Sequence, residues 1–150
     1  MTTLKIGDKA PDFSAKDQDG NIISLNDYKG KKLVIFFYPK ASTPGCTVEA
    51  CNLRDNFERF QALNYEILGV SADSEKRQTN FKIKHKFQYP LLADEDKTVI
   101  NAFGVWGPKK FMGREYDGIH RTTFVINEDG IIDDIILKVK TKAHADQILD

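Results

Sequence analysis

The two cysteines of this chain, Cys46 and Cys51, are the residues whose type and spacing suggest chemistry. Cys46 directly follows a Thr-Pro-Gly turn and precedes residues 47–53, which are predicted to begin a helix. At the first turn of a helix, free backbone N–H groups and the helix dipole favour negative charge. A cysteine in that place is biased toward the thiolate, the form that acts as a nucleophile. Cys46 is therefore the candidate reactive residue.

Cys51 has three possible interpretations: an inert buried thiol, a metal ligand or a redox partner. In a continuous helix, five residues correspond to about 7.5 Å of rise and about 140° of rotation, so the two Cα atoms lie about 8.7 Å apart. A disulfide tolerates a Cα separation of at most about 6.8 Å, so an intact helix keeps the two thiols from bonding. Zinc needs about four ligands, and none of the histidines pairs in spacing with the cysteines. Buried thiols are common, but a core residue on a Thr-Pro-Gly turn is not.

The segments around the cysteines predict how they are positioned. The apolar run 33–38 is typical of a buried central strand, and it ends immediately before the loop that carries Cys46. We expect a helix over 47–63, a second central strand over 65–70 and a second helix over 74–86. Cys46 then lies where a helix emerges from the C-terminal end of a central strand.

The rest of the chain predicts further alternation of strands and helices. Expected are an N-terminal hairpin (13–15 and 22–25), a strand (89–92), a short helix (97–103), a hairpin (122–126 and 131–137) and a last helix (143–149). This order describes an α/β, thioredoxin-like fold with N-terminal β-hairpin additions and a central mixed sheet flanked by helices. Trp106 is expected in a loop, either as a packing anchor or at the rim of a pocket.

Composition indicates one domain over residues 1–150, because no linker or repeat divides the chain. The 22 basic and 22 acidic residues cancel, so no global field attracts nucleic acid or an acidic membrane. The longest apolar run is too short to span a bilayer, and the N-terminal residues lack the apolar core of a signal peptide. With two cysteines at a spacing that a helix cannot bridge, we expect a reducing cytoplasm.

The spacing Pro39-x-x-x-Thr43-x-x-Cys46 resembles the active-site signature of the peroxiredoxins, which are thiol peroxidases. The longer stretch 37–55 resembles the Q-type branch, also called bacterioferritin comigratory proteins. The similarity extends over nearly the whole chain, through the segments 7–13, 70–74, 87–94, 103–107 and 118–126.

The resemblance implies that Cys46 attacks hydrogen peroxide or an organic hydroperoxide and that Cys51 resolves the product as an intramolecular disulfide. A sulfenic acid is the product that a second thiol can condense with. The family implies recycling by thioredoxin or a similar dithiol reductant, and a monomer. Neither a haem nor a flavin motif is present, so no cofactor is expected and the thiols carry the electrons.

Four further site residues follow from the resemblance alone. It implies that Thr43 hydrogen-bonds the peroxide and thiolate, and that Pro39 shields the pocket. Arg121 matches the family's active-site arginine, and Glu49 matches the helix glutamate that orients it. A fixed guanidinium and a hydroxyl donor suit this chemistry because breaking the O–O bond transfers charge to the departing oxygen.

Two other functions stay open on sequence. A thiol–disulfide oxidoreductase could use the same fold, although that activity usually depends on a Cys-x-x-Cys spacing that this chain lacks. A redox-responsive binding or holdase protein would consume peroxide slowly, whereas a peroxidase reacts far faster than free cysteine.

Overall fold

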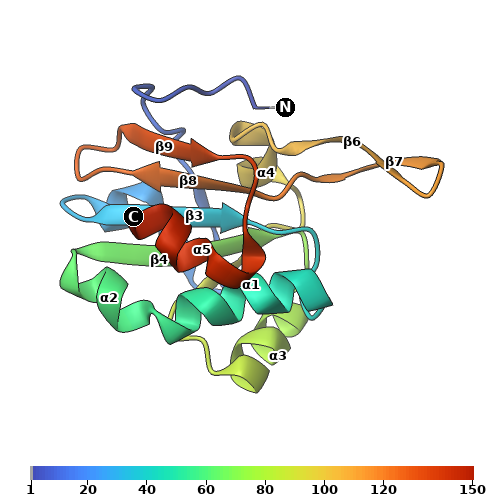
Figure 1. Ribbon diagram of the computed structural model, residues 1–150, viewed down its shortest axis with the longest axis horizontal. Coiled ribbons are helices and arrows are strands. Elements are labelled where there is room, and N and C mark those ends of the chain that lie inside the picture. The colour runs from blue at the N-terminus through green and yellow to red at the C-terminus, as the bar shows by residue number, and fades with distance from the viewer. Residues whose placement is uncertain (1) are drawn as a thin grey trace.

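A five-stranded mixed sheet forms the centre of the computed structural model, which describes residues 2–150 (Figure 1). Its strand order is β5–β4–β3–β8–β9. β3 pairs in parallel with β4, and β4 with β5, whereas β8 and β9 run antiparallel. The strands are β3 (Lys32–Phe37), β4 (Tyr65–Ser71), β5 (Leu91–Ala93), β8 (Thr122–Ile126) and β9 (Ile132–Ile136). The expected α/β fold with a central mixed sheet is confirmed.

After Lys32, strand β3 is apolar from Leu33 to Phe37, and these residues are buried on both faces of the sheet. Leu33, Ile35 and Phe37 belong to one hydrophobic core, and Val34 and Phe36 belong to the other. Successive strand residues point to opposite faces, so a strand covered on both sides needs a continuous apolar run. This is why the sequence signal for β3 is strong.

Helices cover both faces of the sheet (Figure 1). One core contains residues of α1 (Pro44–Asp55), α2 (Phe57–Ala62), α3 (Glu75–His85) and α5 (His144–Leu149). The other contains residues of α4 (Thr98–Ala102) and of the chain beside the hairpin β1 (Ser14–Lys16) and β2 (Ile22–Ser24). Two short 3₁₀ turns, η1 (Leu25–Tyr28) and η2 (Thr141–Ala143), complete the elements, and no helix of residues 2–150 is long and apolar enough to cross a membrane.

The predicted helix over 47–63 is wrong in two respects. It begins earlier, at Pro44, because proline suits the first helical position, where its missing N–H is not needed. It is also interrupted at Asn56, so that α1 and α2 are separate helices. The Asn56 side-chain amide donates to the carbonyl of Asn52 at 2.8 Å, a local bond that competes with the backbone ladder.

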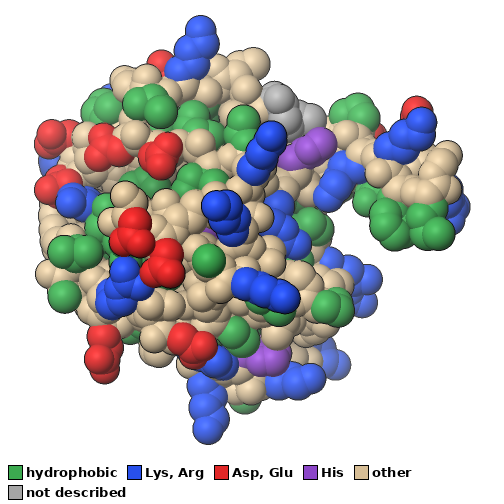
Figure 2. Space-filling view, viewed as in Figure 1, with side chains coloured by type: hydrophobic (Ala, Val, Ile, Leu, Met, Phe, Trp, Pro, Cys, Tyr) green, Lys and Arg blue, Asp and Glu red, His purple; other side chains and the backbone are tan. Residues whose placement is uncertain are grey.

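A hairpin over residues 106–119 was not expected, and the loop predicted for Trp106 is wrong. Trp106 begins β6 (Trp106–Phe111), which pairs with β7 (Arg114–Ile119) through a turn at Met112 and Gly113. Both turn residues have positive φ, 51° and 80°, as a two-residue hairpin turn requires. The hairpin projects from the body with apolar and basic side chains at its end (Figures 1 and 2). Its strands are largely exposed, so they lack the alternation that marks a half-buried strand.

Trp106 itself packs against the core and lies beneath the ammonium of Lys97, 4.8 Å from the ring centroid. The predicted strand at 89–92 is also displaced. β5 begins at Leu91, since Pro90 has no N–H to give to a ladder.

Gly69 provides a test of the packing between β4 and its neighbours. A Cβ at this position would lie 2.8 Å from Leu91 Cδ2 and 2.9 Å from Phe36 Cζ. We expect Gly69→Ala to lower the free energy of unfolding in urea by about 1–3 kcal/mol, because the core would have to move. Gly118→Ala is the control, since its Cβ would lie 3.2 Å from Cδ of the flexible Lys109 side chain and 3.4 Å from Cε2 of the partly exposed Tyr116, outside the core. An equal loss in both variants would contradict the packing argument.

Candidate active site

Cys46 lies in the first turn of α1, as predicted. Strand β3 ends at Phe37, and α1 starts at Pro44 on the C-terminal edge of the sheet. The side chain of Cys46 is buried, with 1% of its surface exposed. Both cysteine thiols are free, and both residues belong to α1. The sequence therefore predicted correctly the helix on which both thiols lie, but the expectation that Cys46 lies outside the core is wrong, since it is a member of the hydrophobic core beneath α1.

The guanidinium of Arg121 reaches the Cys46 thiol. Its Nη2 donates to Cys46 Sγ at 3.3 Å. Arg121 directly precedes β8, whose Thr122 pairs with Phe37 at the end of β3, so the sheet register brings the arginine to the edge where α1 begins. Gly45 makes room for this approach, because a Cβ there would lie 3.3 Å from Arg121 Nη2.

Glu49 holds the other side of the guanidinium. Its Oε1 accepts from Arg121 Nη1 at 2.6 Å, and its side chain is fully buried. Glu49 follows Cys46 by three positions, which places both on the inner face of α1. Burial raises the pKa of Glu49 to about 7, and the charge and hydrogen bond of Arg121 oppose that rise. The structure thus joins Cys46, Arg121 and Glu49 in one cluster.

The hydroxyl of Thr43 is turned to the backbone and makes no hydrogen bond to the thiol. Thr43 is the N-cap residue of α1, but its hydroxyl donates to the Lys40 carbonyl at 2.7 Å. Within the described part of the chain, no side chain caps this helix. The first-turn N–H groups beside Cys46 are therefore free to bind an oxygen atom.

Asp73 anchors the loop that leads to Cys46, and sequence reasoning gave it no role. Its Oδ2 accepts from the backbone N–H of Ala41 at 2.7 Å and from the Ser71 hydroxyl at 2.6 Å. Asp73 is buried just after β4, on the same sheet edge as the loop after β3. Its contact with Ala41 joins residues 32 positions apart and depends on which strands become neighbours, so the sequence carried no local signal for it.

Cys51 lies off the inner face of α1. The buried positions of the helix are Cys46, Glu49, Ala50 and Leu53, whereas Cys51 is half-buried. Burial raises the pKa of the Cys51 thiol; Arg54 opposes this rise and Asp55 adds to it. In an α-helix the Cα atoms of these two cysteines are about 8.7 Å apart, which is beyond disulfide reach.

The sequence model of the AhpC/TSA family matches residues 6–135, which is more than half of the chain. The chain belongs to the AhpC/TSA family. It is 47% identical over 150 residues to peroxiredoxin Bcp of Escherichia coli strain K12, and the match covers 100% of this chain and 96% of that protein.

Solved structures agree with this assignment. A cysteine-to-serine mutant of Xylella fastidiosa PrxQ superposes with a TM-score of 0.92 at 31% identity, over 99% of this chain and 95% of that one. The Xanthomonas campestris bacterioferritin comigratory protein, solved in connection with its alkyl peroxide reduction activity, gives a TM-score of 0.87 at 36% identity over 99% and 95%. The resemblance to the Q-type peroxiredoxins is confirmed, and the chain is a peroxidase of this type, acting on peroxides with a thiol reductant.

A pocket of about 370 Å³ lies beside the cysteine loop of this peroxiredoxin, under the β6–β7 hairpin. Pro39 lines it, together with Trp106 and Lys109. Trp106 is thus both a packing residue and part of the pocket rim. Lys109 was not predicted; its ammonium donates to the Ile119 carbonyl at 2.9 Å, and burial and Arg121 lower its pKa, while Cys46 opposes this.

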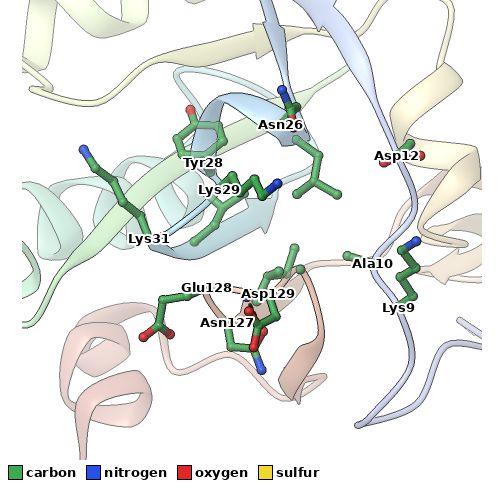
Figure 3. Close-up of a pocket in the computed structure, with 14 residues that line it drawn as sticks. Lys9, Ala10, Asp12, Asn26, Tyr28, Lys29, Lys31, Asn127, Glu128 and Asp129 are labelled. Atoms are coloured by element: carbon green, nitrogen blue, oxygen red, sulfur yellow. Dashed lines mark hydrogen bonds between the residues drawn. The ribbon is translucent and has the colours of Figure 1, made fainter.

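Another pocket, of about 330 Å³, has no cysteine in its lining, and Figure 3 shows its lining residues. It is lined by Leu33 at the start of β3 and Ile126 at the end of β8, so it opens at the opposite end of the sheet from Cys46. Among residues 2–150, no group of three or more His, Cys, Asp or Glu side chains is placed to hold a metal ion.

The raised pKa of Glu49 predicts a pH-dependent stability. A carboxyl whose pKa is near 4.5 when unfolded and about 7 when folded stabilises the fold at low pH, and this contribution is lost as pH rises through that interval. In the Glu49→Gln variant, the free energy of unfolding in urea should not show this decrease with pH. In the wild type the decrease is at most about 1.4 kcal/mol per pH unit. The exposed residue Glu58 is the control, and Glu58→Gln should behave as the wild type. If the unfolding free energy of Glu49→Gln fell with pH as it does in the wild type, the pH dependence would not come from Glu49.

Proposed function

We propose that this peroxiredoxin reduces hydrogen peroxide and organic hydroperoxides with Cys46 as the nucleophile. The observation that carries the proposal is the 3.3 Å contact between Arg121 Nη2 and Cys46 Sγ. A positive charge against a buried sulfur stabilises the thiolate over the thiol. A thiol that served only to pack would not need a guanidinium on it.

The first step forms a sulfenic acid. The thiolate sulfur attacks one peroxide oxygen, so that an S–O bond forms and the O–O bond breaks. The sulfur is oxidised by two electrons, and the departing oxygen takes a proton from solvent and leaves as water or an alcohol. Arg121 and the uncapped N–H groups of α1 lie where they can stabilise the departing charge; one such prearranged donor is typically worth about 3 kcal/mol.

The neighbouring residues support this step. In the proposal, Glu49 orients Arg121 by its 2.6 Å hydrogen bond. Pro39 shields the pocket that it lines. The Thr43 hydroxyl, which donates to Lys40, has its lone pairs left to accept a hydrogen bond from a peroxide O–H.

The second step forms a Cys46–Cys51 disulfide. The Cys51 thiol attacks the sulfenic sulfur, water leaves, and a dithiol reductant then restores both thiols. Thioredoxin is the proposed reductant, and a reducing cytoplasm is the proposed compartment, because a disulfide there is transient and catalytic. The proposed functional unit is a monomer, since both thiols of the cycle belong to one helix. The alkyl peroxide reduction activity of the Xanthomonas protein supports organic hydroperoxides as substrates.

The roles of the two cysteines are tested by separate substitutions. Cys46→Ser should abolish peroxide reduction, because a serine hydroxyl is not ionised near neutral pH and supplies no nucleophilic anion. Cys51→Ser should leave the first oxidation at the wild-type rate but stop turnover with thioredoxin. Stopped-flow mixing with hydrogen peroxide, followed by Trp106 fluorescence, measures the first step, and reductant consumption measures turnover. Steady-state turnover in Cys51→Ser equal to the wild type would remove Cys51 from the resolving role, and a wild-type rate no faster than free cysteine would remove the peroxidase assignment to Cys46.

The disulfide requires α1 to unwind, and amide hydrogen exchange can detect this. After one equivalent of peroxide, exchange should quicken across 47–55, because those residues lose helical hydrogen bonds. The buried residues of β3, 33–37, should stay protected and serve as the internal control. Identical exchange of α1 in both redox states, with the disulfide verified by mass spectrometry, would contradict the unwinding.

A further inference from the structure

A histidine from the last helix reaches the active-site glutamate. His144 begins α5 and is fully buried. Its Nε2 lies 3.5 Å from Glu49 Oε2 and 2.7 Å from Thr123 Oγ1, and its Nδ1 lies 2.9 Å from Gln147 Oε1. The family signature around Cys46 contains no such residue, so the contact extends the site to the far end of the chain.

The hydrogen bonds around Gln147 assign the tautomer of His144. Gln147 Nε2 donates to the Lys138 carbonyl at 2.8 Å, and the Lys140 N–H donates to Gln147 Oε1 at 3.0 Å. The amide oxygen therefore faces His144 Nδ1. Because that oxygen only accepts, Nδ1 carries a proton.

The remaining nitrogen, Nε2, faces two oxygens. A neutral ring accepts the Thr123 O–H there and presents no donor to Glu49 Oε2. This explains why Glu49 Oε2, among the described residues, is the one buried side-chain oxygen or nitrogen without a hydrogen-bond partner. One added proton between His144 Nε2 and Glu49 Oε2 would turn the 3.5 Å contact into a charge-assisted pair.

We propose that His144 is a positioning residue for peroxide reduction: by sharing a proton with Glu49 Oε2, it holds Glu49 and thereby keeps Arg121 on the Cys46 thiol. The inference rests on the function proposed above. A carboxylate with one oxygen unsatisfied in a buried site is costly and prone to turn away. If Glu49 turned, Arg121 would lose its 2.6 Å anchor.

The charges around the pair support a single shared proton. Burial raises the pKa of Glu49 to about 7 and lowers the pKa of His144, so neither group keeps a full charge by itself. The charged or titratable groups beside the pair include Arg121, from the segment before β8, and the Cys46 thiol beyond it on α1. The buried phenol of Tyr89 also lies near Glu49, and it donates to the Ala50 carbonyl of α1 at 2.7 Å. The acidic residue of α5, Asp146, turns instead to the surface. Because Arg121 already bonds Glu49 Oε1, one proton between Glu49 Oε2 and His144 Nε2 would give both carboxylate oxygens a hydrogen-bond partner.

Two substitutions of His144 test the proposal by the second-order rate with hydrogen peroxide as a function of pH. In the wild type, the rate should fall as pH rises above about 7, where the pair loses its proton. His144→Phe removes the nitrogen and should slow the reaction roughly tenfold at neutral pH, less than the loss of a group that touches the peroxide. His144→Gln offers an N–H to Glu49 at every pH, so it should keep the neutral rate and lose the alkaline fall.

Arg59→Ala is the matched control, because Arg59 ties α5 to the protein through Asp146 at 2.8 Å without touching His144. This variant should keep the wild-type rate and pH profile. A wild-type profile in both His144 variants, or an equal slowing in Arg59→Ala, would overturn the proposal.

Nuclear magnetic resonance of the wild type tests the same pair without relying on activity. The His144 Nδ1 should be protonated at every pH, and the Nε2 and the Glu49 carboxyl should titrate together near neutral pH. An unprotonated Nδ1, or two independent titrations, would overturn the proposal even if His144→Phe failed to fold. A wild-type peroxide rate no faster than free cysteine would instead contradict the proposed function. The NMR titration would still test the His144–Glu49 pair in that case.

Discussion

A buried guanidinium between a thiol and a carboxylate is the interaction on which the site depends. Arg121 spans the gap between Cys46 Sγ and Glu49 Oε1 with two nitrogens of one rigid plane. Burying such a pair costs several kcal/mol of hydration per ion, so the arrangement is a poor source of stability. The arrangement contributes orientation instead: because the guanidinium is planar, its hydrogen bond to Glu49 fixes the direction of the N–H group that faces Cys46. A lysine, with a single point of charge, could not hold both contacts in this way.

The sheet supplies the positions that this fork needs. The parallel strands β3 and β4 end at the same edge, where the loop after β3 leads to α1 and the turn after β4 carries Asp73. The antiparallel strand β8 begins at that edge, so Arg121 arrives from the opposite direction. Ligand and reaction sites of open α/β sheets commonly lie outside the carboxyl ends of their strands. The pocket at the other end of the sheet has charged residues in its lining but no thiol.

The sequence predicted the elements whose formation depends on residues close together in the chain. The run that became β3 was identifiable because both faces are buried, and the placement of Cys46 followed from a turn and a helix start. The β6–β7 hairpin was missed because exposed strands such as Trp106–Phe111 need no hydrophobic period, and its turn uses Met112 where asparagine or aspartate is usual.

The contacts of His144 and Asp73 were also beyond sequence reasoning, since each depends on which strands become neighbours. Asp73 meets Ala41 across 32 positions of sequence, and His144 meets Thr123 across 21. Neither pair leaves a spacing that a single sequence reveals. The roles carried over from the family resemblance were brought together only in part: Arg121 and Glu49 converge on Cys46, whereas the Thr43 hydroxyl turns to Lys40.

The break at Asn56 sets a boundary on how much of the molecule a redox cycle must disturb. A single helix from 44 to 62 would transmit fraying at its N-terminal end toward Phe60, a fully buried aromatic ring of the core. With the ladder interrupted, α1 forms a small cooperative unit whose inner apolar residues are mainly Ala50 and Leu53. Releasing a leucine costs about 1.5–3 kcal/mol, and releasing an aromatic ring would add a similar amount. The interruption therefore limits the free energy needed to unwind α1, and the sheet and its main core can stay folded.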